Sequence, residues 1–320
     1  MTELALRRSE LDRARVMRLL QDYGVYAGVA VLFLVNVALT PNFVSAENFR
    51  TQAVQVAPVM IVALGMALAI GSEGVDLSVG SVMALSTSLI SLYLGYGPWI
   101  AVLVAVLGGM LVGLANGSLI AFIGVQPIVA TLALMVAGRG AALVLLPQLK
   151  DVRDPGMAAL GSGSVLGIPY VVVIAVALAV AVAFTVRRTT FGRRLLAIGD
   201  SRPAAQLAGL PVRRVLIIVY VVCGALAAVA GVLATARLTA SDPTSLGTLM
   251  ELSAITAVVV GGTPLSGGRV RIGGTVAGAI LIQLLTATLI KHDLPPSWTQ
   301  IAQAIVIVAA VYAARERGKR

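Results

Sequence analysis

The sequence predicts an all-α integral membrane protein with about ten transmembrane helices. Of its 320 residues, 58% are hydrophobic and only 12% are charged, whereas soluble domains average about 45–50% and about 25%. The apolar runs are rich in Val, Leu, Ala and Ile, and they lack the two-residue alternation of membrane-barrel strands. Because backbone groups inside lipid must pair within the protein, these runs are expected to be helices.

Ten apolar runs, bounded by Gly, Pro and polar residues, are candidate spans. They cover 24–40, 53–71, 76–94, 98–116, 126–147, 168–186, 215–236, 249–262, 273–290 and 298–313. The third and eighth runs are short or interrupted by glycine, so the sequence leaves open whether they cross fully or are re-entrant. Glycines four residues apart, at Gly109, Gly113 and Gly117 and at Gly274 and Gly278, predict closely packed helices.

The placement of positive charge predicts that both termini lie in the cytoplasm. With ten spans, 18 of the 24 Lys and Arg fall in inside segments: the N-terminal tail, 187–214, 263–272 and the C-terminal tail. Cytoplasmic segments carry such an excess, and Trp99 and Trp298 then fall at the outer interface. The predicted organisation is an amphipathic cytoplasmic tail over 1–22, one transmembrane domain over 23–314 and a basic cytoplasmic tail over 315–320. No cleaved signal peptide is expected.

Several classes of protein are disfavoured by what the sequence lacks. The basic clusters have few aromatic neighbours, which argues against nucleic-acid binding. Lys150, Lys291 and Lys319 are not followed by Ser or Thr, so the chain has no phosphate-binding P-loop. The predicted spans lack the paired ionisable groups that ion-driven carriers use. His292 is alone and Cys223 is the sole cysteine, so no catalytic cluster, metal site or disulfide is predicted.

The longest inside loop, 187–214, is the most informative segment. It carries seven arginines, and Pro203 after a capping Asp or Ser is typical of the start of a short helix. A solvated basic loop would explain the arginines alone. The apolar Leu207 and Leu210 beside Gly209 suit a helix docked on another protein, so docking of a partner is the favoured interpretation.

Two further segments combine glycines with polar residues. The stretch Gly74–Ser81 contains Asp76 and Ser78, either of which could cap the helix that follows. The second stretch starts at Glu251 and continues through Gly261–Gly268, where the glycines require tight turns. Capping and turn formation are sufficient explanations of both patterns, so neither pattern alone indicates a substrate.

In combination and in order, these segments resemble the permease subunits of ribose, xylose and galactofuranose-type importers of the ABC class. Gly74–Ser81 is similar to the family signature Gly-Ile-Asp-Leu-Ser-Val-Gly-Ser. The match continues through 126–132, the Ala-Gly-Arg-Gly run at 137–140, the loop after Phe191, the stretch at Glu251 and the glycines of 261–268. The resemblance covers about residues 45–313 and is closest to the galactofuranose-type branch.

The resemblance implies the pore subunit of an ATP-driven monosaccharide importer in the bacterial cytoplasmic (inner) membrane, with the type II architecture of vitamin B12 permeases. The implied partners are a cytoplasmic ABC ATPase that binds ATP and Mg, a periplasmic sugar-binding protein and a second permease copy or homologue. No cofactor is expected on this chain. The residues expected to couple it to the ATPase are Phe191, Gly192, Arg193, Ala197, Gly199, Asp200, Ala204 and Gly209. The expected structural signature residues are Asp76, Ser78, Gly80, Arg139 and Glu251.

Two departures from the family pattern weaken a specific ribose assignment. Ser253 stands where many members have Asp, and Leu284–Thr288 replaces an Asn-rich stretch of the ribose branch. The polar residues inside spans that could line a substrate path are Asn116, Thr131, Gln283 and Gln303. The alternatives are an ABC permease for a nucleoside, a sugar-like signal molecule or a branched-chain amino acid, and an ion-coupled secondary carrier.

Overall fold

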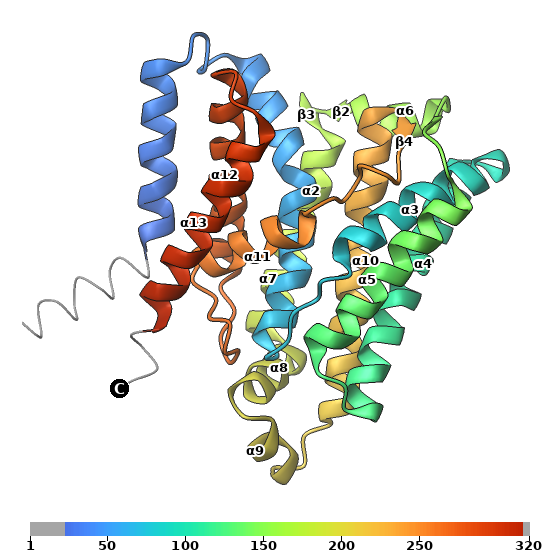
Figure 1. Ribbon diagram of the computed structural model, residues 1–320, viewed down its shortest axis with the longest axis vertical. Helices are drawn as coiled ribbons and strands as arrows, with labels where there is room; N and C mark the ends of the chain where they lie inside the picture. The colour runs from blue at the N-terminus through green and yellow to red at the C-terminus, as the bar shows by residue number, and fades with distance from the viewer. Residues whose placement is uncertain (1–22, 316–320) are drawn as a thin grey trace, which may run out of the picture.

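The computed structural model describes residues 23–315, and each of the ten predicted runs contains a helix (Figure 1). The main helices are Tyr23–Leu39, α2 (Ala46–Gly71), α3 (Val79–Tyr93), α4 (Pro98–Ser118), α5 (Pro127–Leu145), α7 (Tyr170–Arg188), α10 (Val212–Leu238), α11 (Met250–Val260), α12 (Ile272–Lys291) and α13 (Pro296–Arg315). The predicted tail 1–22 and, apart from Arg315, the predicted tail 315–320 lie outside the described residues.

Within the described part of the chain, seven helices are long and apolar enough to cross a membrane. They are α2, α3 with its 3-10 extension to Tyr96, α4 with its π turn to Ile123, α5, α7, α10 and α12, whereas Tyr23–Leu39 and α11 are shorter apolar helices. The prediction of a predominantly helical membrane protein is confirmed.

Short elements between the long helices depart from the all-helical expectation. There are two antiparallel ladders, and every strand in them has two residues. In one ladder β1 (Lys150–Asp151) pairs with β4 (Ala240–Ser241), and in the other β2 (Ser164–Val165) pairs with β3 (Ile168–Pro169). The small helix α6 (Pro155–Ser162) lies between β1 and β2 in sequence. Two more short helices, α8 (Thr190–Asp200) and α9 (Arg202–Leu207), follow α7. The ladders are too short to change the helical character of the fold.

The helices α2 and α10 form the centre of the bundle, and α10 packs against α2, α3 and α4. The spaced glycines allow these helices to approach with backbone in contact. A Cβ atom on Gly113 would lie 2.2 Å from the carbonyl oxygen of Tyr220, and one on Gly224 would lie 2.1 Å from the carbonyl oxygen of Gly109. The close packing predicted from the glycine spacing is therefore confirmed, with α10 as the partner of α4.

The helices of the third and eighth predicted spans, α3 and α11, are each preceded by a non-helical stretch of chain. After α2 ends, residues 72–78 run back into the bundle without helical structure, and α3 begins near the middle of the bundle (Figure 1). After β4, residues 242–249 descend from the opposite end, and α11 begins near the same level. These are the two segments whose irregularity the sequence indicated. Non-helical backbone is tolerated at membrane depth where protein surrounds it, and Ser72, Gly74, Asp76 and Ser78 are buried.

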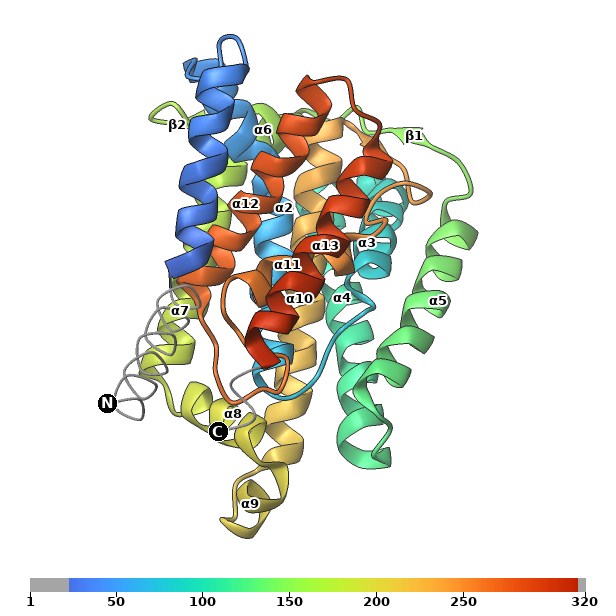
Figure 2. The same ribbon diagram turned by 60° about the vertical axis from the view of Figure 1, so that its left-hand side comes forward.

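The two ends of the bundle differ. The segments α8 and α9 project from one end, where Tyr23–Leu39 begins and α13 finishes (Figures 1 and 2). The ladders and α6 cover the opposite end. Trp99 and Trp298, both more than half exposed, lie in the first turns of α4 and α13 at that opposite end.

Candidate functional site

The segment between α7 and α10 folds into two short capped helices. The Thr189 hydroxyl accepts a hydrogen bond from the Gly192 N–H (3.3 Å), which caps α8, and the Ser201 hydroxyl accepts one from the Ala204 N–H (3.3 Å), which caps α9. Pro203 lies in the first turn of α9, and Gly209 ends the helix with a φ of +74°. The short helix predicted from Pro203 is therefore present, with Ser201 as its cap.

The residues predicted to couple the chain to an ATPase fall into two groups. Most are exposed on α8 and α9: Arg193, Ala197, Asp200, Ala204 and Gly209. Their neighbour Leu207 is 91% exposed at the projecting end of α9. Gly192 and Gly199 are buried instead, and Phe191 packs partly against the core. One group can meet a partner protein, and the other attaches the segment to the bundle.

Four glycines join α8 to the bundle, and we call them the glycine junction: Gly71, Gly199, Gly267 and Gly268. A Cβ atom on Gly199 would lie 1.9 Å from the Gly71 carbonyl oxygen and 2.6 Å from the Gly268 nitrogen. The Gly268 N–H donates to that same Gly71 carbonyl (3.1 Å). Backbone from α2, α8 and the α11–α12 loop therefore meets at one point, with no room for a side chain on Gly199.

Arg202 makes a second attachment beside the glycine junction. Its guanidinium donates to the carbonyl oxygens of Ser72 (3.2 Å) and Glu73 (3.3 Å), and its Nε atom lies 3.8 Å from the Glu73 carboxylate. Ser72 and Glu73 begin the non-helical chain that leads to α3. A displacement of α9 would therefore pull on the third span directly.

A buried hydrogen-bond network holds the non-helical chain before α3 in place. Oδ1 of Asp76 accepts from the backbone N–H (2.9 Å) and the hydroxyl (2.6 Å) of Ser78, and the Asn116 amide donates to that hydroxyl (2.9 Å). Ser78 occupies the predicted N-cap position of α3, but neither its side chain nor that of Asp76 accepts a hydrogen bond from an N–H group of the helix. Asp76 instead stabilises the turn that enters it.

The first turn of α3 meets the chain before α11 through Gly80 and Gly247. A Cβ atom on Gly80 would lie 2.3 Å from the Gly247 carbonyl oxygen and 2.5 Å from Oε2 of Glu251, so the Glu251 carboxylate lies against the first turn of α3. Arg139 on α5 donates to the carbonyl oxygens of Pro243 (2.8 Å) and Leu246 (2.9 Å). A carboxylate is favoured at a helix N-terminus, and the arginine fixes the loop before α11. The predicted signature residues Gly80, Arg139 and Glu251 thus converge.

The four residues predicted to line a substrate path do not form one group. Asn116 and Thr131 are fully buried, and Thr131 donates to the carbonyl oxygens of Val75 and Pro127. Gln283 of α12 donates to the side chains of Gln52 and Gln55 on α2, and Gln303 of α13 donates to Ser253 of α11 (3.4 Å). Only Gln303 lies beside the residues around Glu251.

Sequence reasoning did not single out Arg202, Gly71 or Gly247. Arg202 was one of seven arginines in a basic loop, and nothing in the residue itself distinguishes it. Gly71 is the last residue of the second predicted span, and Gly247 lies just before the eighth. Nothing else in the sequence distinguished either glycine. Their roles depend on contacts between segments more than 100 residues apart.

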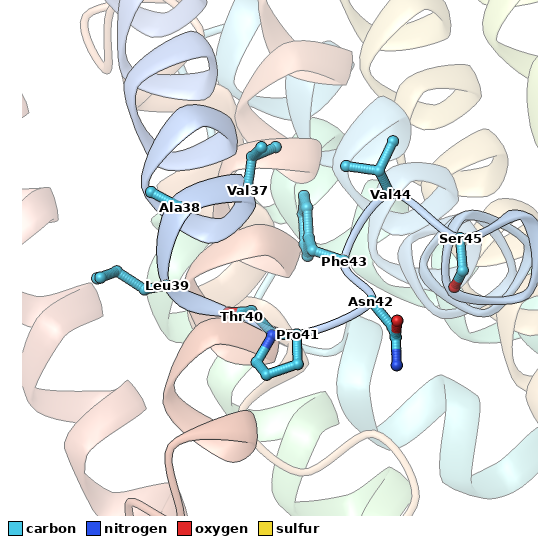
Figure 3. A pocket seen from close by; sticks show the side chains of 9 residues that line it. All are labelled: Val37, Ala38, Leu39, Thr40, Pro41, Asn42, Phe43, Val44 and Ser45. Carbon is cyan, nitrogen blue, oxygen red and sulfur yellow. The ribbon is translucent and has the colours of Figure 1, made fainter.

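A hollow of about 550 Å3 (Figure 3) lies at the turn before α2, which Figure 1 shows at the end opposite α8 and α9. Its lining comes from one continuous stretch: Val37, Ala38, Leu39, Thr40, Pro41, Asn42, Phe43, Val44 and Ser45. Because no second element contributes a polar group to it, we do not assign it to function. Among the described residues, no three His, Cys, Asp or Glu side chains come together as a metal site.

The fold and the site define a polytopic membrane protein with a segment that projects from one end. Comparison with known proteins identifies the family. Residues 48–311 match the family model described as "Branched-chain amino acid transport system / permease component". The chain belongs to this family.

Its relatives include permease proteins from three organisms. It is 38% identical over 264 residues to the galactofuranose transporter permease protein of Escherichia coli, covering 82% of this chain and 77% of the relative. It is 36% identical to the fructose import permease protein of Bifidobacterium longum (78% and 72% covered). It is 35% identical to the ribose import permease protein of Bacillus subtilis (97% and 97% covered).

Proposed function

We propose that this chain is the transmembrane pore subunit of a bacterial ATP-driven importer for a monosaccharide, located in the inner membrane. The observation that carries the proposal is the capped segment α8–α9, which projects from the bundle with Leu207 exposed and is tied to the start of the third span by Arg202. Family membership supplies the permease class.

The substrate class rests on the relatives. Their names specify galactofuranose, fructose and ribose, which are all monosaccharides, and a fourth relative is an L-arabinose transport system permease protein. Galactofuranose, ribose and xylose remain the sugars indicated by the sequence motifs. The second candidate is a branched-chain amino acid, which the description of the family model favours. Nucleosides and sugar-like signal molecules are further candidates for a permease of this kind.

The proposed assembly has three kinds of partner. A cytoplasmic ABC ATPase, which binds ATP and Mg, docks on the exposed residues of α8 and α9. A periplasmic sugar-binding protein delivers substrate at the end that carries the ladders and α6. A second permease copy or homologue completes the pore. In this arrangement the chain crosses the membrane ten times with both termini in the cytoplasm, has the type II permease architecture, and catalyses no reaction itself.

The chain's own residues would transmit the motion of the ATPase. A displacement of α8 reaches α2 and the α11–α12 loop through the glycine junction, and a displacement of α9 reaches residues 72–78 through Arg202. The third and eighth spans would therefore both move with the ATPase, and such movement is needed to open the path to each side of the membrane in turn. An ion-coupled secondary carrier would need no such partner, so transport that survives deletion of the ATPase would overturn this proposal.

The test combines ligand screening with reconstituted transport. The binding protein encoded beside this chain is screened by calorimetry or thermal shift against ribose, fructose, arabinose, galactofuranose and leucine. The permease, the ATPase and the binding protein are then reconstituted in proteoliposomes, and uptake is measured with and without ATP. ATP-dependent uptake of a sugar is the expected result. ATP-dependent uptake of leucine alone would replace the sugar assignment by the amino-acid assignment.

A further inference from the structure

Five polar residues lie close to the point where α3 and α11 begin, and we call them the polar strip: Arg139, Thr248, Glu251, Ser253 and Gln303. Thr248 is exposed, and the other four are half-buried. They lie on one face, because α13 packs on α11, α11 touches α3, and α3 packs on α5. Figure 2 shows this face turned toward the viewer, with α5 standing at one side and α13 crossing in front.

Other exposed faces of the bundle have a different chemistry. The side chains more than 45% exposed in the middle of α4 are Leu103, Leu107 and Leu111, and those of α7 are Val176, Val180 and Phe184. Such faces suit lipid. Charged side chains at membrane depth face the protein interior or a water-filled cavity instead. Arg139 and Glu251 therefore indicate that the face between α5 and α13 is not covered by lipid.

Both charged groups are held in fixed positions and retain hydrogen-bonding capacity. Arg139 uses Nη1 for the carbonyls of Pro243 and Leu246, which leaves other guanidinium N–H groups for a ligand. The Glu251 carboxylate lies against Gly80, and within residues 23–315 it forms no ion pair shorter than 4 Å. Ser253 and Gln303 are joined by a long hydrogen bond of 3.4 Å, which a ligand hydroxyl could replace.

We propose that the polar strip is the wall of the substrate path and binds the hydroxyl groups of a sugar in transit, the opposite wall being the same strip of a second copy of this chain. The inference rests on the proposed function. A carboxylate accepts from two neighbouring hydroxyls, a guanidinium donates to them, and Ser and Gln do both. Half-buried groups of this kind bind weakly, and a transport path needs binding that is weak enough for release.

Cysteine labelling tests whether the strip faces water, independently of which solute is transported. Single cysteines are placed at Thr248, Ser253 and Gln303 of the path, and at Leu107 and Val180 as controls on the apolar faces, where both side chains are more exposed than Ser253 and Gln303. The parent chain, whose only cysteine Cys223 is buried, gives the background. The complex with the ATPase in lipid nanodiscs is treated with a charged, water-soluble methanethiosulfonate, and labelling is followed by mass spectrometry.

We expect the strip cysteines to react at least about tenfold faster than the controls, because the thiolate that reacts forms only in water. Equal, slow labelling at Ser253, Gln303 and the two control positions would overturn the proposal. So would fast labelling at Ser253 and Gln303 that leaves uptake by the reconstituted complex unchanged, because a blocked path cannot conduct.

A second measurement examines recognition of the solute. Uptake of radiolabelled ribose, fructose and arabinose is compared for the parent, Glu251→Gln and Arg139→Lys, with ATP hydrolysis and ATPase co-purification measured in the same preparations. We expect uptake to fall about tenfold for Glu251→Gln, with ATP hydrolysis and assembly retained. Parental uptake in both variants would overturn the role in recognition. A parent complex that imports none of the sugars would refute the proposed substrate class, and labelling would still decide whether the strip faces a path.

Discussion

The glycine junction at the α8 end and the polar strip in the middle of the bundle both involve α11 and neighbouring loops, but different atoms make their contacts. At the junction, backbone meets backbone, and a Cβ atom on Gly199 would lie 1.9 Å from a carbonyl oxygen. In the strip, long side chains are half exposed and partly unpaired. Close packing transmits displacement because it cannot be compressed, whereas an exposed polar wall can exchange its partners.

The difference separates two kinds of substitution. A side chain added at the junction forces the backbone of three segments apart, so the expected loss is in coupling. A side chain changed in the strip leaves the packing intact, so the expected loss is in transport of the solute.

Gly199→Ala should have the largest effect, because overpacking of a tight contact costs about 1–3 kcal/mol and the added methyl group meets the backbone of two other segments, at Gly71 and Gly268. ATP-driven uptake in proteoliposomes should fall more than about tenfold. Gly24→Ala is the matched control, since no atom lies within 4 Å of a Cβ there. Parental uptake by Gly199→Ala would show that the junction does not transmit motion.

Arg202→Ala should have the next largest effect, because it removes two charge-assisted hydrogen bonds to the chain before α3. Such a bond contributes about 1.5–3 kcal/mol, so we expect about a tenfold loss of uptake. ATP hydrolysis should continue, because Arg202 points at the bundle and not at the partner. Loss of ATPase co-purification instead would mean that Arg202 belongs to the docking surface.

Leu207→Asp should weaken docking of the ATPase without changing the stability of the permease. Its side chain is 91% exposed, so the folded bundle loses no contact. A buried apolar side chain contributes about 1.5–3 kcal/mol to an interface, and co-purification of the ATPase should fall accordingly. Leu166→Asp is the control, because Leu166 is 98% exposed at the opposite end. Equal co-purification by the two variants would contradict docking at α9.

Asn116→Leu should lower stability and leave the transport affinity unchanged. The substitution removes the hydrogen bond to the Ser78 hydroxyl inside the bundle, which costs about 1–3 kcal/mol. Thermal unfolding measures the first effect, and the KM of uptake in the folded fraction measures the second. A raised KM would support the alternative expectation, drawn from the sequence, that Asn116 lines the substrate path.

The lengths of the apolar runs, and the Gly, Pro and polar residues that bound them, were sufficient to predict most of the helices. The predicted run 98–116 corresponds to α4, and 273–290 corresponds to α12, each within two residues. The start of α2 was predicted seven residues late, because its first turns carry Glu47, Asn48 and Arg50. A capping Ser45, which accepts from the Asn48 N–H, sets that start. Polar first turns extend beyond the apolar run, and hydropathy cannot detect them.

The site was harder to predict because its contacts are distant in sequence. The glycine motif around 74–81 marked the non-helical chain before α3, and the one around 261–268 marked the loop between α11 and α12. Nothing local indicated that Gly71 meets Gly199, or that Arg139 reaches the loop before α11. Polarity inside a span was also an ambiguous signal: Asn116 is fully buried and donates to the Ser78 hydroxyl, whereas Ser253 is half-buried on the face that we assign to the path.

The exposed Leu207 on α9 has a consequence for the cell. An apolar side chain on a projecting helix favours association with other apolar surfaces when its own partner is missing. Binding of the ATPase would remove that surface and would stabilise the folded permease by mass action. Permease made in excess of its ATPase should therefore aggregate or be degraded, so the cell has to match the synthesis of the two subunits.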